Sequence, residues 1–289
     1  MRFKVLSLFD GISCGQVALH RAGIAPTLYM ASEIDKPAIT CTQSNFPQTV
    51  QLGDVIKVRE MAEAGFFGQG DIDLLMGGSP CQGFSSGGDG LGFDDPRSAL
   101  FFEFVRIKNA IKPKNFLLEN VKMRSDWLDL ISLYMGVNPV FINSSDFSAQ
   151  KRARFYWTNL TVNPWIANGI VLSDILIDGW FSEKEKSYCI VANYGKGTNF
   201  KRYNHRGSRQ IVFRKGLEIP KTTEENANFI QRLIPDQWRM LTVTECERLQ
   251  TLPDGYTRAI KKSEAYKAIG NGWTVDVIAH IFKGLSNAI

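Results

Sequence analysis

The stretch "GGSPCQGFSSGG", residues 77–88, places a cysteine directly after a proline at the end of the apolar run "DIDLLM". A cysteine in this position is either a small buried hydrophobic residue or a nucleophilic thiol. Pro80 fixes its own φ angle and restricts Ser79, so the backbone that leads to Cys81 is stiff. The glycines that follow allow the next loop to move. A fixed nucleophile beside a loop that can close over a substrate favours covalent catalysis.

A carboxylic acid follows a second apolar run in "LLENV", where Glu119 and Asn120 end a predicted strand. If this strand lies beside the one that precedes Cys81 in a parallel sheet, both ends meet at one edge and can face the same substrate. An acid after a strand is also a common helix cap. None of the three histidines lies near a recognisable Cys-His protease motif, so activation of the thiol by imidazole is not evident.

Three further acids follow apolar runs near the N-terminus: Asp10 in "LFDGISCG", Glu33 in "ASEID" and Asp54 in "LGDV". Open parallel sheets bind ligands beyond the carboxyl ends of their strands. Glu33 lies about twenty residues after the first glycine turn, the offset at which nucleotide sites hold a ribose. The G-x-G-x-x-G pattern that a pyrophosphate requires is missing, so an adenosine without phosphate is favoured. Structural turns remain an alternative explanation for the glycines.

The elements that must position these residues alternate along the first half of the chain. Strand-like runs at 3–9, 27–32, 72–78, 115–120, 139–147 and 153–160 are separated by helical spacing at 15–23, 36–46, 97–112 and 125–135. This alternation predicts an α/β fold with a doubly wound, mostly parallel sheet. Helical patterns return at 242–252 and 274–289. The segment between is basic, contains glycine and has only short strand-like pieces. We therefore predict a catalytic and cofactor-binding domain at 1–162, a smaller domain at 163–240, and a C-terminal segment at 241–289 that returns to the first.

Composition limits the possible classes of protein. The 289 residues carry a formal net charge of +5, and 44% of them are hydrophobic. The five cysteines and three histidines are dispersed without C-x-x-C spacing, so we expect no metal site and no disulfides. There is no signal-peptide pattern and no apolar run of membrane-spanning length, so we expect a soluble, cytoplasmic protein without a membrane partner.

The charge is uneven, because residues 196–217 contain seven Lys or Arg and no Asp or Glu. Such a run is commonly a solvated surface, but the interleaved Tyr, Asn, His and Gly favour contact with nucleic acid. Most of these cations would contact phosphates, since that is where most protein–DNA hydrogen bonds go. The candidates are Lys201, Arg202, Arg206, Arg209, Arg214 and Lys215. A guanine base contact is most plausible among Arg202, Arg206 and Arg209.

Eight motifs, in one order, cover nearly the whole chain: "FDGISCG", "ASEID", "GDV", "GGSPCQGFS", "LLENV", "QKRAR", "ERLQTLP" and "AIGNGWTV". Together they resemble the C5-cytosine DNA methyltransferase family. The resemblance implies the class I S-adenosylmethionine-dependent methyltransferase fold with an inserted target-recognition domain. It also implies S-adenosylmethionine as methyl donor, S-adenosylhomocysteine as product, no metal, and double-stranded DNA as partner.

The resemblance assigns a cofactor pocket to residues from both ends of the chain. Glu33 would hold the ribose hydroxyls, with Ile34 beside it, and Asp54 and Val55 would contact the adenine. The pocket would be completed by Phe9, Asp10, Gly11, Ile12, Pro80, Leu100, Asn271, Gly272 and Trp273.

The resemblance also implies a mechanism in which Cys81 attacks C6 of a flipped-out cytosine while Glu119 donates a hydrogen bond or proton to N3. C5 then takes the methyl group, and β-elimination frees the cysteine. Arg152 and Arg154 would hold the O2 side of the base, Gln150 would be structural support, and Ser85 would enter the gap left in the duplex.

Two other functions share these motifs. The tRNA-cytosine branch has the same catalytic residues, but its C-F-T motif is not found in this sequence. A catalytically inactive regulatory homologue normally lacks the Pro-Cys or Glu-Asn-Val motif, and both are intact here. "GWTV" and "RSALFFEF" resemble the animal de novo branch, yet that branch's accessory modules are missing. We therefore expect a bacterial or bacteriophage enzyme, with a restriction endonuclease as a possible partner.

Overall fold

The computed structural model describes residues 3–80, 99–197, 209–219, 228, 232–233 and 236–287. Of the predicted site residues, Cys81, Ser85, Lys201, Arg202 and Arg206 lie outside these ranges. Among the described residues, no helix is long and apolar enough to cross a membrane. The same residues contain no group of three or more His, Cys, Asp or Glu arranged to hold a metal ion.

The chain forms two compact units, each built from separate segments. The first comprises Met1–Ile142, Ala153–Pro164 and Val277–Ile289, and the second comprises Asn143–Arg152 and Trp165–Asp276. The predicted boundary at 163 is close to the division between Pro164 and Trp165. The chain returns to the first unit at Val277, whereas the predicted return to the first domain is at 241. The reason is packing: the Tyr266 hydroxyl donates to the Leu241 carbonyl at 2.8 Å, and its ring contacts Tyr194 edge-on.

The first unit contains a seven-stranded sheet in the order β3-β2-β1-β4-β5-β7-β6. Strands β1 to β5 pair in parallel, and β7 pairs antiparallel to β5. The predicted doubly wound, mostly parallel sheet is therefore confirmed. The strands are β1 Lys4–Leu8, β2 Leu28–Ser32, β3 Val50–Gln51, β4 Leu74–Gly78, β5 Asn115–Val121, β6 Val140–Asn143 and β7 Ala153–Thr158.

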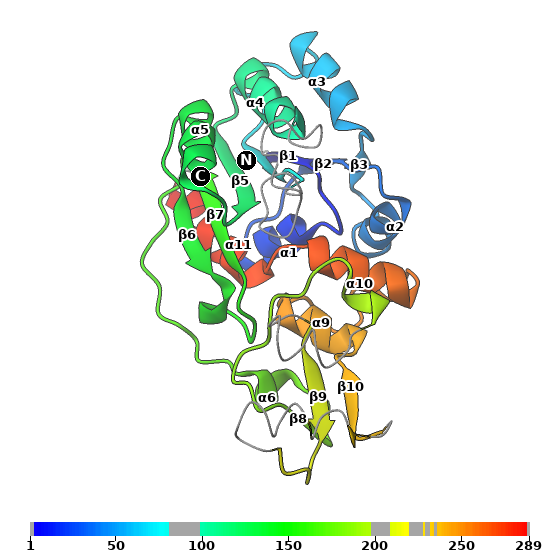
Figure 1. Ribbon diagram of the computed structural model, residues 1–289. Coiled ribbons are helices and arrows are strands. Elements are labelled where there is room, and N and C mark those ends of the chain that lie inside the picture. The colour runs from blue at the N-terminus through cyan, green and yellow to red at the C-terminus, as the bar shows by residue number, and fades with distance from the viewer. Residues whose placement is uncertain are drawn as a thin grey trace. The chain divides into compact units, whose positions relative to one another are not determined.

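Helices cover both faces of this sheet (Figure 1). Crossover connections between parallel strands are right-handed, so those that run outward from β1 in opposite directions place their helices on opposite faces of the sheet. One face carries α3 (Val55–Glu63), α4 (Ala99–Ile111) and α5 (Ser125–Met135), which bury a common apolar core against the strands. The other carries α1 (Cys14–Arg21), α2 (Lys36–Asn45) and α11 (Val275–Phe282). The predicted helices therefore form, with Pro37 in the first turn of α2.

Close packing explains one glycine of the "GGSPC" motif. Gly77 lies in β4 opposite Leu8 of β1. A Cβ atom at Gly77 would lie 2.7 Å from the Leu8 carbonyl oxygen, closer than real contacts allow, and 3.2 Å from the Phe104 ring, which is tighter than most real contacts. A side chain there would push β4 away from its neighbours, so Gly77 is required for the path of the strand that leads to Cys81.

The second unit contains a three-stranded antiparallel sheet in the order β10-β9-β8. Its strands are β8 Trp180–Phe181, β9 Ile211–Arg214 and β10 Trp238–Met240, and its helices include α6 Leu172–Ile175, α9 Val243–Leu249 and α10 Lys262–Asn271. Helix α9 begins with a capping box, in which Thr242 and Glu245 satisfy each other's backbone N–H groups. The short strand-like pieces predicted in this region are thus present.

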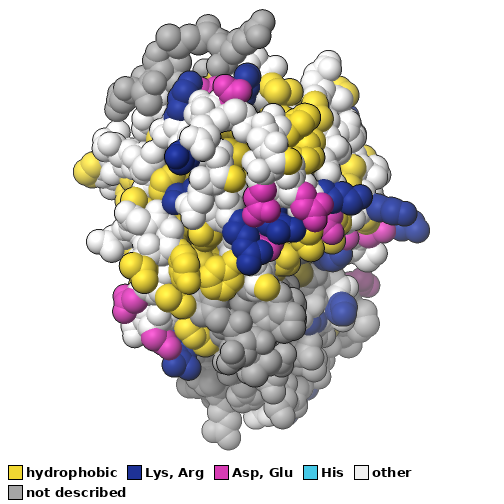
Figure 2. Space-filling model, turned by 90° about the horizontal axis from the view of Figure 1, so that it is seen from above, with side chains coloured by type: hydrophobic (Ala, Val, Ile, Leu, Met, Phe, Trp, Pro, Cys, Tyr) yellow, Lys and Arg dark blue, Asp and Glu magenta, His cyan; other side chains and the backbone are white. Residues whose placement is uncertain are grey.

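Charges are mixed on the surface that Figure 2 shows, with Lys and Arg side chains next to Asp and Glu. Ion pairs on α3 and α4 illustrate this mixing: Arg59 contacts Glu63 at 3.5 Å and Glu103 at 3.0 Å, and Arg106 contacts Glu103 at 2.9 Å. A DNA-binding face normally presents cations that are not neutralised in this way. These two helices therefore do not form such a face.

Candidate active site

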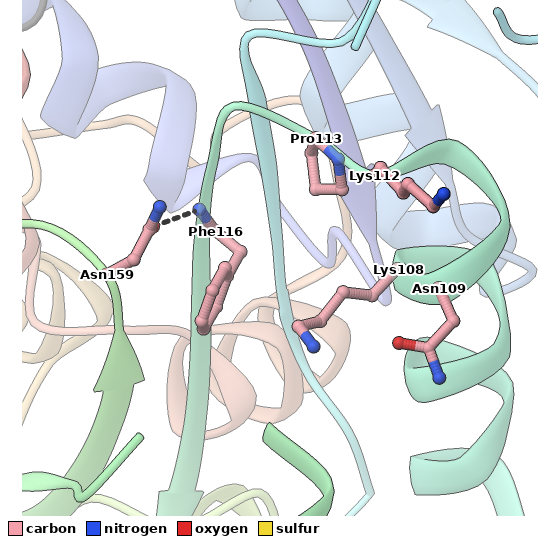
Figure 3. A pocket seen from close by; sticks show the side chains of 6 residues that line it. All are labelled: Lys108, Asn109, Lys112, Pro113, Phe116 and Asn159. Carbon is pink, nitrogen blue, oxygen red and sulfur yellow. Dashed lines mark hydrogen bonds between the residues drawn. The ribbon is translucent and has the colours of Figure 1, made fainter. Parts of the chain in front are cut away.

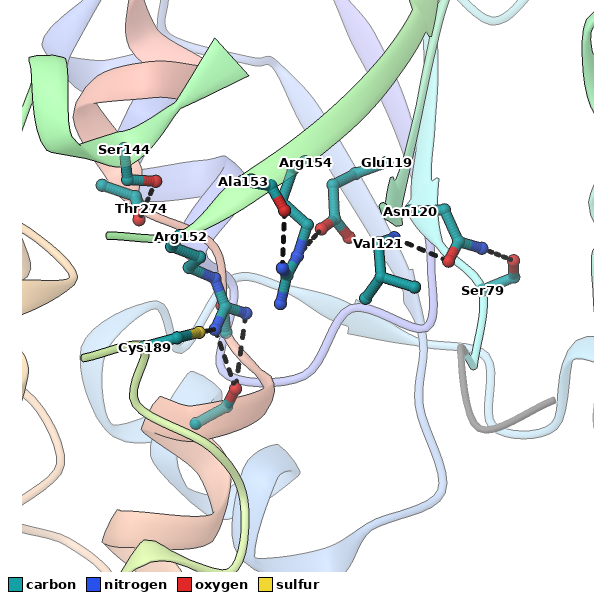
Figure 4. Close-up of polar contacts among 12 residues, drawn as sticks. Ser79, Glu119, Asn120, Val121, Ser144, Arg152, Ala153, Arg154, Cys189 and Thr274 are labelled. Atoms are coloured by element: carbon teal, nitrogen blue, oxygen red, sulfur yellow. Dashed lines mark hydrogen bonds and ion pairs between the residues drawn. The ribbon is translucent and has the colours of Figure 1, made fainter. Parts of the chain in front are cut away.

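The carboxyl ends of β4 and β5 lie side by side, as the sequence predicts. Gly78 is paired with Glu119 in the parallel register. The Asn120 side chain, which is 1% exposed, donates to the Ser79 hydroxyl at 3.2 Å and accepts from the Val121 amide at 2.8 Å. These bonds hold the chain immediately before Pro80 and Cys81 against the end of β5 (Figure 4).

Glu119 forms an ion pair with Arg154 from the antiparallel strand β7. The Arg154 Nε and Glu119 Oε1 atoms are 2.8 Å apart, and the two side chains are only 15% and 11% exposed. Arg154 also donates from Nη1 to the Ala153 carbonyl, which fixes the guanidinium (Figure 4). Both are predicted site residues, but no pattern in the sequence indicates that they pair. The pair gives the sheet edge an oriented carboxyl group with a cation beside it.

Arg152 has a different environment from Arg154. Its side chain is 4% exposed, and its guanidinium donates to the carbonyls of Ile190 at 3.0 Å and Gly272 at 2.8 Å. Further bonds reach the Gly270 carbonyl and the Cys189 sulfur. The donors that the sequence analysis assigned to the base's O2 side are therefore used to hold backbone of the second unit. In this structure the Arg152 guanidinium therefore stabilises the fold of the second unit.

Gln150 belongs to a buried network in the second unit. Its Nε2 donates to the Leu249 carbonyl at 2.7 Å and to Gln250 Oε1 at 2.9 Å, and its Oε1 accepts from the Ile190 amide. Gln250 in turn donates to the carbonyls of Ile269 and Gly272. These buried amides are satisfied by fixed partners, so Gln150 is the structural support that the sequence suggested.

The Glu33 carboxylate organises the end of β2. Its Oε2 accepts from the Gly11 amide at 2.8 Å, and its Oε1 accepts from the amides of Ile34 and Asp35 at the same distance. A carboxylate offers about four lone-pair positions, so capacity remains for a ligand hydroxyl. Ile34 is 71% exposed, which places apolar surface beside the acid. Gly11 has a φ angle of 58°, and open space surrounds its Cβ position.

Asp10 is held inside the loop between β1 and α1. Its carboxylate accepts from the Tyr29 hydroxyl at 2.6 Å and from the Ser13 hydroxyl. Burial raises the pKa of Asp10 to about 6, and the Glu33 charge adds to this, although hydrogen bonds from Ser13, Ser7 and Tyr29 oppose it. No spacing in the sequence signalled the Tyr29 contact, which depends on the pairing of β1 with β2.

The remaining residues assigned to the cofactor occupy several environments. Asp54 caps α3, because its carboxylate accepts a hydrogen bond from the Ile56 amide at 2.9 Å. Val55 is only 5% exposed and its side chain packs in the core, so its backbone is the part that can contact a ligand. Phe9 has a φ angle of 57° and packs against the core with Leu100, while the Ile12 side chain is 1% exposed. Pro80 is partly exposed in the first unit. Asn271, Gly272 and Trp273 belong to the second unit, where Asn271 is exposed.

These groups fit a nucleoside better than a phosphate. Acids stand at the ends of β2 and β3, next to exposed Ile34, and an acid is a hydrogen-bond acceptor for ribose hydroxyls. An additional negative charge beside Glu33 and Asp10 would be repelled. The described residues are therefore compatible with the adenosine part of S-adenosylmethionine.

A separate pocket of about 350 Å³ lies at the opposite edge of the sheet, around the start of β5 (Figure 3). Its lining residues are Lys108, Asn109, Lys112, Pro113, Phe116 and Asn159. The Lys108 ammonium lies 5.2 Å from the centre of the Phe116 ring, and burial lowers the pKa of Lys108. The lining contains no acid and no nucleophile other than lysine, so this pocket lacks the acid that the end of β5 carries.

Three of the six candidate DNA-contacting cations, Arg209, Arg214 and Lys215, lie in the described ranges, and Arg209 is 6% exposed with a φ angle of 63°. Its guanidinium donates to the Gly197 carbonyl. This bond engages only Nη1 of a group that carries five N–H donors, and it does not bear on base recognition. The assignment of Arg209 to base recognition therefore stays a prediction.

Comparison with known proteins identifies relatives over the whole chain. The C-5 cytosine-specific DNA methylase family model matches residues 3–163 and 167–287. The type II methyltransferase M1.ScrFI of Lactococcus lactis subsp. cremoris is 29% identical over 318 residues, covering 96% of this chain and 76% of that protein. The type II methyltransferase M.NlaX of Neisseria lactamica is also 29% identical, over 99% of this chain and 97% of that protein.

Solved structures show the same fold at low identity. The Entamoeba histolytica methyltransferase EhMeth aligns with a TM-score of 0.75 at 15% identity, over 100% of this chain and 99% of that one. The S. pombe Dnmt2 methyltransferase aligns with a TM-score of 0.71 at 17% identity, over 99% of each chain. Because the family model covers both units and includes every motif that forms the sheet edge, the chain belongs to the C-5 cytosine-specific DNA methylase family.

Proposed function

We propose that this protein transfers a methyl group from S-adenosylmethionine to C5 of a flipped-out cytosine in a specific DNA sequence, through a covalent bond to Cys81. The observation that carries the proposal is the Glu119–Arg154 pair at the end of β5, beside the Ser79–Pro80 segment that precedes Cys81. An acid oriented by a buried cation at the point where the chain enters a cysteine loop suits addition to a pyrimidine ring.

The proposed reaction begins with bond formation between the Cys81 sulfur and C6 of the cytosine. Electron density moves toward N3, where Glu119 supplies a hydrogen bond or proton as negative charge develops. Arg154 holds the Glu119 carboxyl in place and balances its charge whenever it is ionised. After C5 has been methylated, its proton passes to a solvent water molecule and the sulfur–C6 bond breaks, which restores the C5–C6 double bond and releases Cys81 as a thiolate.

S-adenosylmethionine supplies an electrophilic methyl group when it is bound. We assign the ribose to Glu33 with Ile34 beside it, and the adenine to Asp54 and the Val55 backbone. The exposed Ile34 side chain and the remaining acceptor capacity of Glu33 support this assignment. The loop residues Phe9, Asp10, Gly11 and Ile12, with Pro80, Leu100, Asn271, Gly272 and Trp273, would complete the site. Arg152 has a positioning role, since it binds the carbonyls of Gly270 and Gly272 on either side of Asn271.

The DNA substrate is a duplex from which one cytosine is extruded, because a base inside the stack cannot be reached by the thiol. Ser85 would enter the resulting gap, and the basic segment would contact the backbone and bases through Lys201, Arg202, Arg206 and Arg209. We assign the target-recognition domain, predicted at 163–240, to the second unit, which also contains the helices up to 276. We place the enzyme in the cytoplasm of a bacterial or phage-infected cell, where the type II names of its relatives favour a partner restriction endonuclease.

The test is expression of the full chain in a host without cytosine methylation, followed by bisulfite sequencing of the host DNA. Wild-type protein should leave methylated cytosines in one short sequence context. Cys81→Ser should leave none, while the matched control Cys41→Ser, in helix α2, should retain methylation. Glu119→Gln should slow methyl transfer by about two to four powers of ten.

A second measurement separates covalent catalysis from other routes. A duplex with 5-fluorocytosine at the methylated position cannot lose a C5 proton, so the wild-type protein should remain bonded to it after denaturation. Methyl transfer by Cys81→Ser, or the absence of any bonded complex with an active wild-type enzyme, would overturn the mechanism. Transfer to tRNA without transfer to DNA would overturn the proposed substrate.

A further inference from the structure

Strands β8, β9 and β10 form the small antiparallel sheet of the second unit (Figure 1). The two faces of this sheet carry chemically distinct side chains. Phe181 is paired with Phe213, and Phe213 with Trp238, and all three belong to one apolar cluster. Side chains alternate between the faces of a strand, so the neighbouring pair, Trp180 and Arg214, shares the opposite face. That face therefore presents an indole ring and a guanidinium from directly opposed positions.

Two arginines contact the Trp180 ring. The Arg214 Cζ atom is 5.4 Å from the ring centre, and the Arg239 Cζ atom is 4.4 Å from it. Both distances lie within the range of cation–π attraction, which is electrostatic and orients the guanidinium relative to the ring. Trp180 therefore organises two cations on one face of the sheet.

The two cations differ in what balances their charge. Arg239 makes a two-bond ion pair with Glu245, at 2.6 and 2.8 Å, and the Glu245 side chain is fully buried. Burial opposes the ionisation of Glu245, but the bonds from Arg239 and from the Ile177 and Thr242 amides leave its pKa below the ordinary value. Arg214 is exposed, and among the described residues it has no carboxylate partner.

We propose that Arg214, held on the face of Trp180, binds a phosphate of the DNA backbone. This inference rests on the proposed function and adds to it a specific contact of the second unit. Stacking on an indole leaves the edge of the guanidinium free, and the parallel N–H groups of that edge match two phosphate oxygens. Arg214 extends from a paired strand, so little conformational freedom is lost when the contact forms.

The neighbouring Lys215 provides a matched control. It is the next residue, it carries the same charge and its side chain is 61% exposed, but it lies 3.4 Å from the Asp178 carboxylate. A cation that already has a carboxylate partner gains less from a phosphate than an unpaired one. Lys215→Ala should therefore affect DNA binding less than Arg214→Ala does.

The experiment measures the affinity of the full chain for a duplex of about 30 base pairs at salt concentrations from about 50 to 200 mM. Each phosphate contact contributes a slope of about −0.9 to the plot of log affinity against log salt. Arg214→Ala should remove one contact on any sequence. The ratio of wild-type to variant affinity should then shrink about 3.5-fold between the two salt concentrations.

Trp180→Leu keeps the charge but removes the stack. It should weaken binding by about 2- to 5-fold at every salt concentration, without a change of slope. Arg214→Lys should likewise keep the slope and lose part of the affinity, because a lysine cannot form the two-bond contact. Circular dichroism and thermal unfolding of each variant establish that the sheet has folded.

Three outcomes would overturn the inference. An unchanged slope and affinity for Arg214→Ala makes the Trp180–Arg214 stack purely structural. A loss confined to the methylated sequence makes Arg214 a base-reading residue, and an equal loss for Lys215→Ala makes the effect one of general charge. A wild-type protein that neither binds nor methylates any duplex contradicts the proposed function instead, so the two failures are distinguishable.

Discussion

Removal of the Arg154 side chain should destabilise the fold strongly, because it leaves the Glu119 carboxylate without a counter-charge. Unit charges separated by 2.8 Å attract each other by about 6 kcal/mol at an effective dielectric constant of about 20. Exposures of 15% and 11% allow little screening by solvent. Breaking a buried pair by removing one partner costs about 3–5 kcal/mol, and we expect Arg154→Met to fall in this range.

A double-mutant cycle isolates the pair. Arg154→Met, Glu119→Gln and the double variant are unfolded in urea, with the slope of the unfolding free energy against urea checked for constancy. The double variant should recover part of the unfolding free energy that Arg154→Met loses, which corresponds to a coupling energy of about 2–3 kcal/mol between the two side chains. Arg124 and Asp126 form the control pair, since they are 2.8 Å apart but 67% and 53% exposed, and their coupling should stay below about 1 kcal/mol. A coupling for Glu119 and Arg154 as small as that of the control would refute the reasoning.

Other residues give further predictions. Because the pKa of Asp10 is about 6 in the folded protein against an ordinary 3.8, the folded state holds a proton that the unfolded state has lost. The unfolding free energy of the wild type should fall by up to about 3 kcal/mol as the pH rises from about 4 to 6, and urea titrations of Asp10→Asn should lack this fall. Glu33→Ala should weaken S-adenosylmethionine binding about tenfold or more in calorimetry, and an unchanged affinity would remove Glu33 from the site. Arg152→Met should lower the unfolding free energy by about 3–5 kcal/mol, since several buried carbonyls lose their hydrogen-bond donor. A decrease of less than about 1 kcal/mol would show that these bonds are not formed in solution.

The sheet and its active edge could be predicted because they depend on local patterns. Apolar runs separated by helical spacing imply parallel strands, and parallel strands end at one edge. Residues that follow such runs therefore meet in space whatever their distance along the chain. Gly78 and Glu119 illustrate this, since they are paired in register although forty residues lie between them along the chain.

The interactions within that edge could not be predicted, because they depend on pairings between distant strands. The antiparallel placement of β7 against β5 brings Arg154 to Glu119, and nothing in "QKRAR" indicates the direction of that strand. The C-terminal division depends on distant contacts in a similar way. Helical spacing predicts a helix at 242–252, where α9 forms, but the attachment of α9 and α10 to the second unit depends on bonds from Gln150 and Tyr266.

The "QKRAR" motif shows why residue type alone does not assign a role. Arg152 and Arg154 are two residues apart and equally basic, yet one ends a segment of the second unit and the other lies in the first. Arg154 faces a carboxylate, so its charge is what the site uses, and any cation that reached Glu119 would preserve part of the interaction. Arg152 faces carbonyl oxygens from separate segments, so the site uses the planar fork of its guanidinium, which a lysine cannot supply. The chemical identity of the acceptors, rather than the motif, therefore separates the residue beside Glu119, our proposed catalytic acid, from the one that holds the backbone around Asn271.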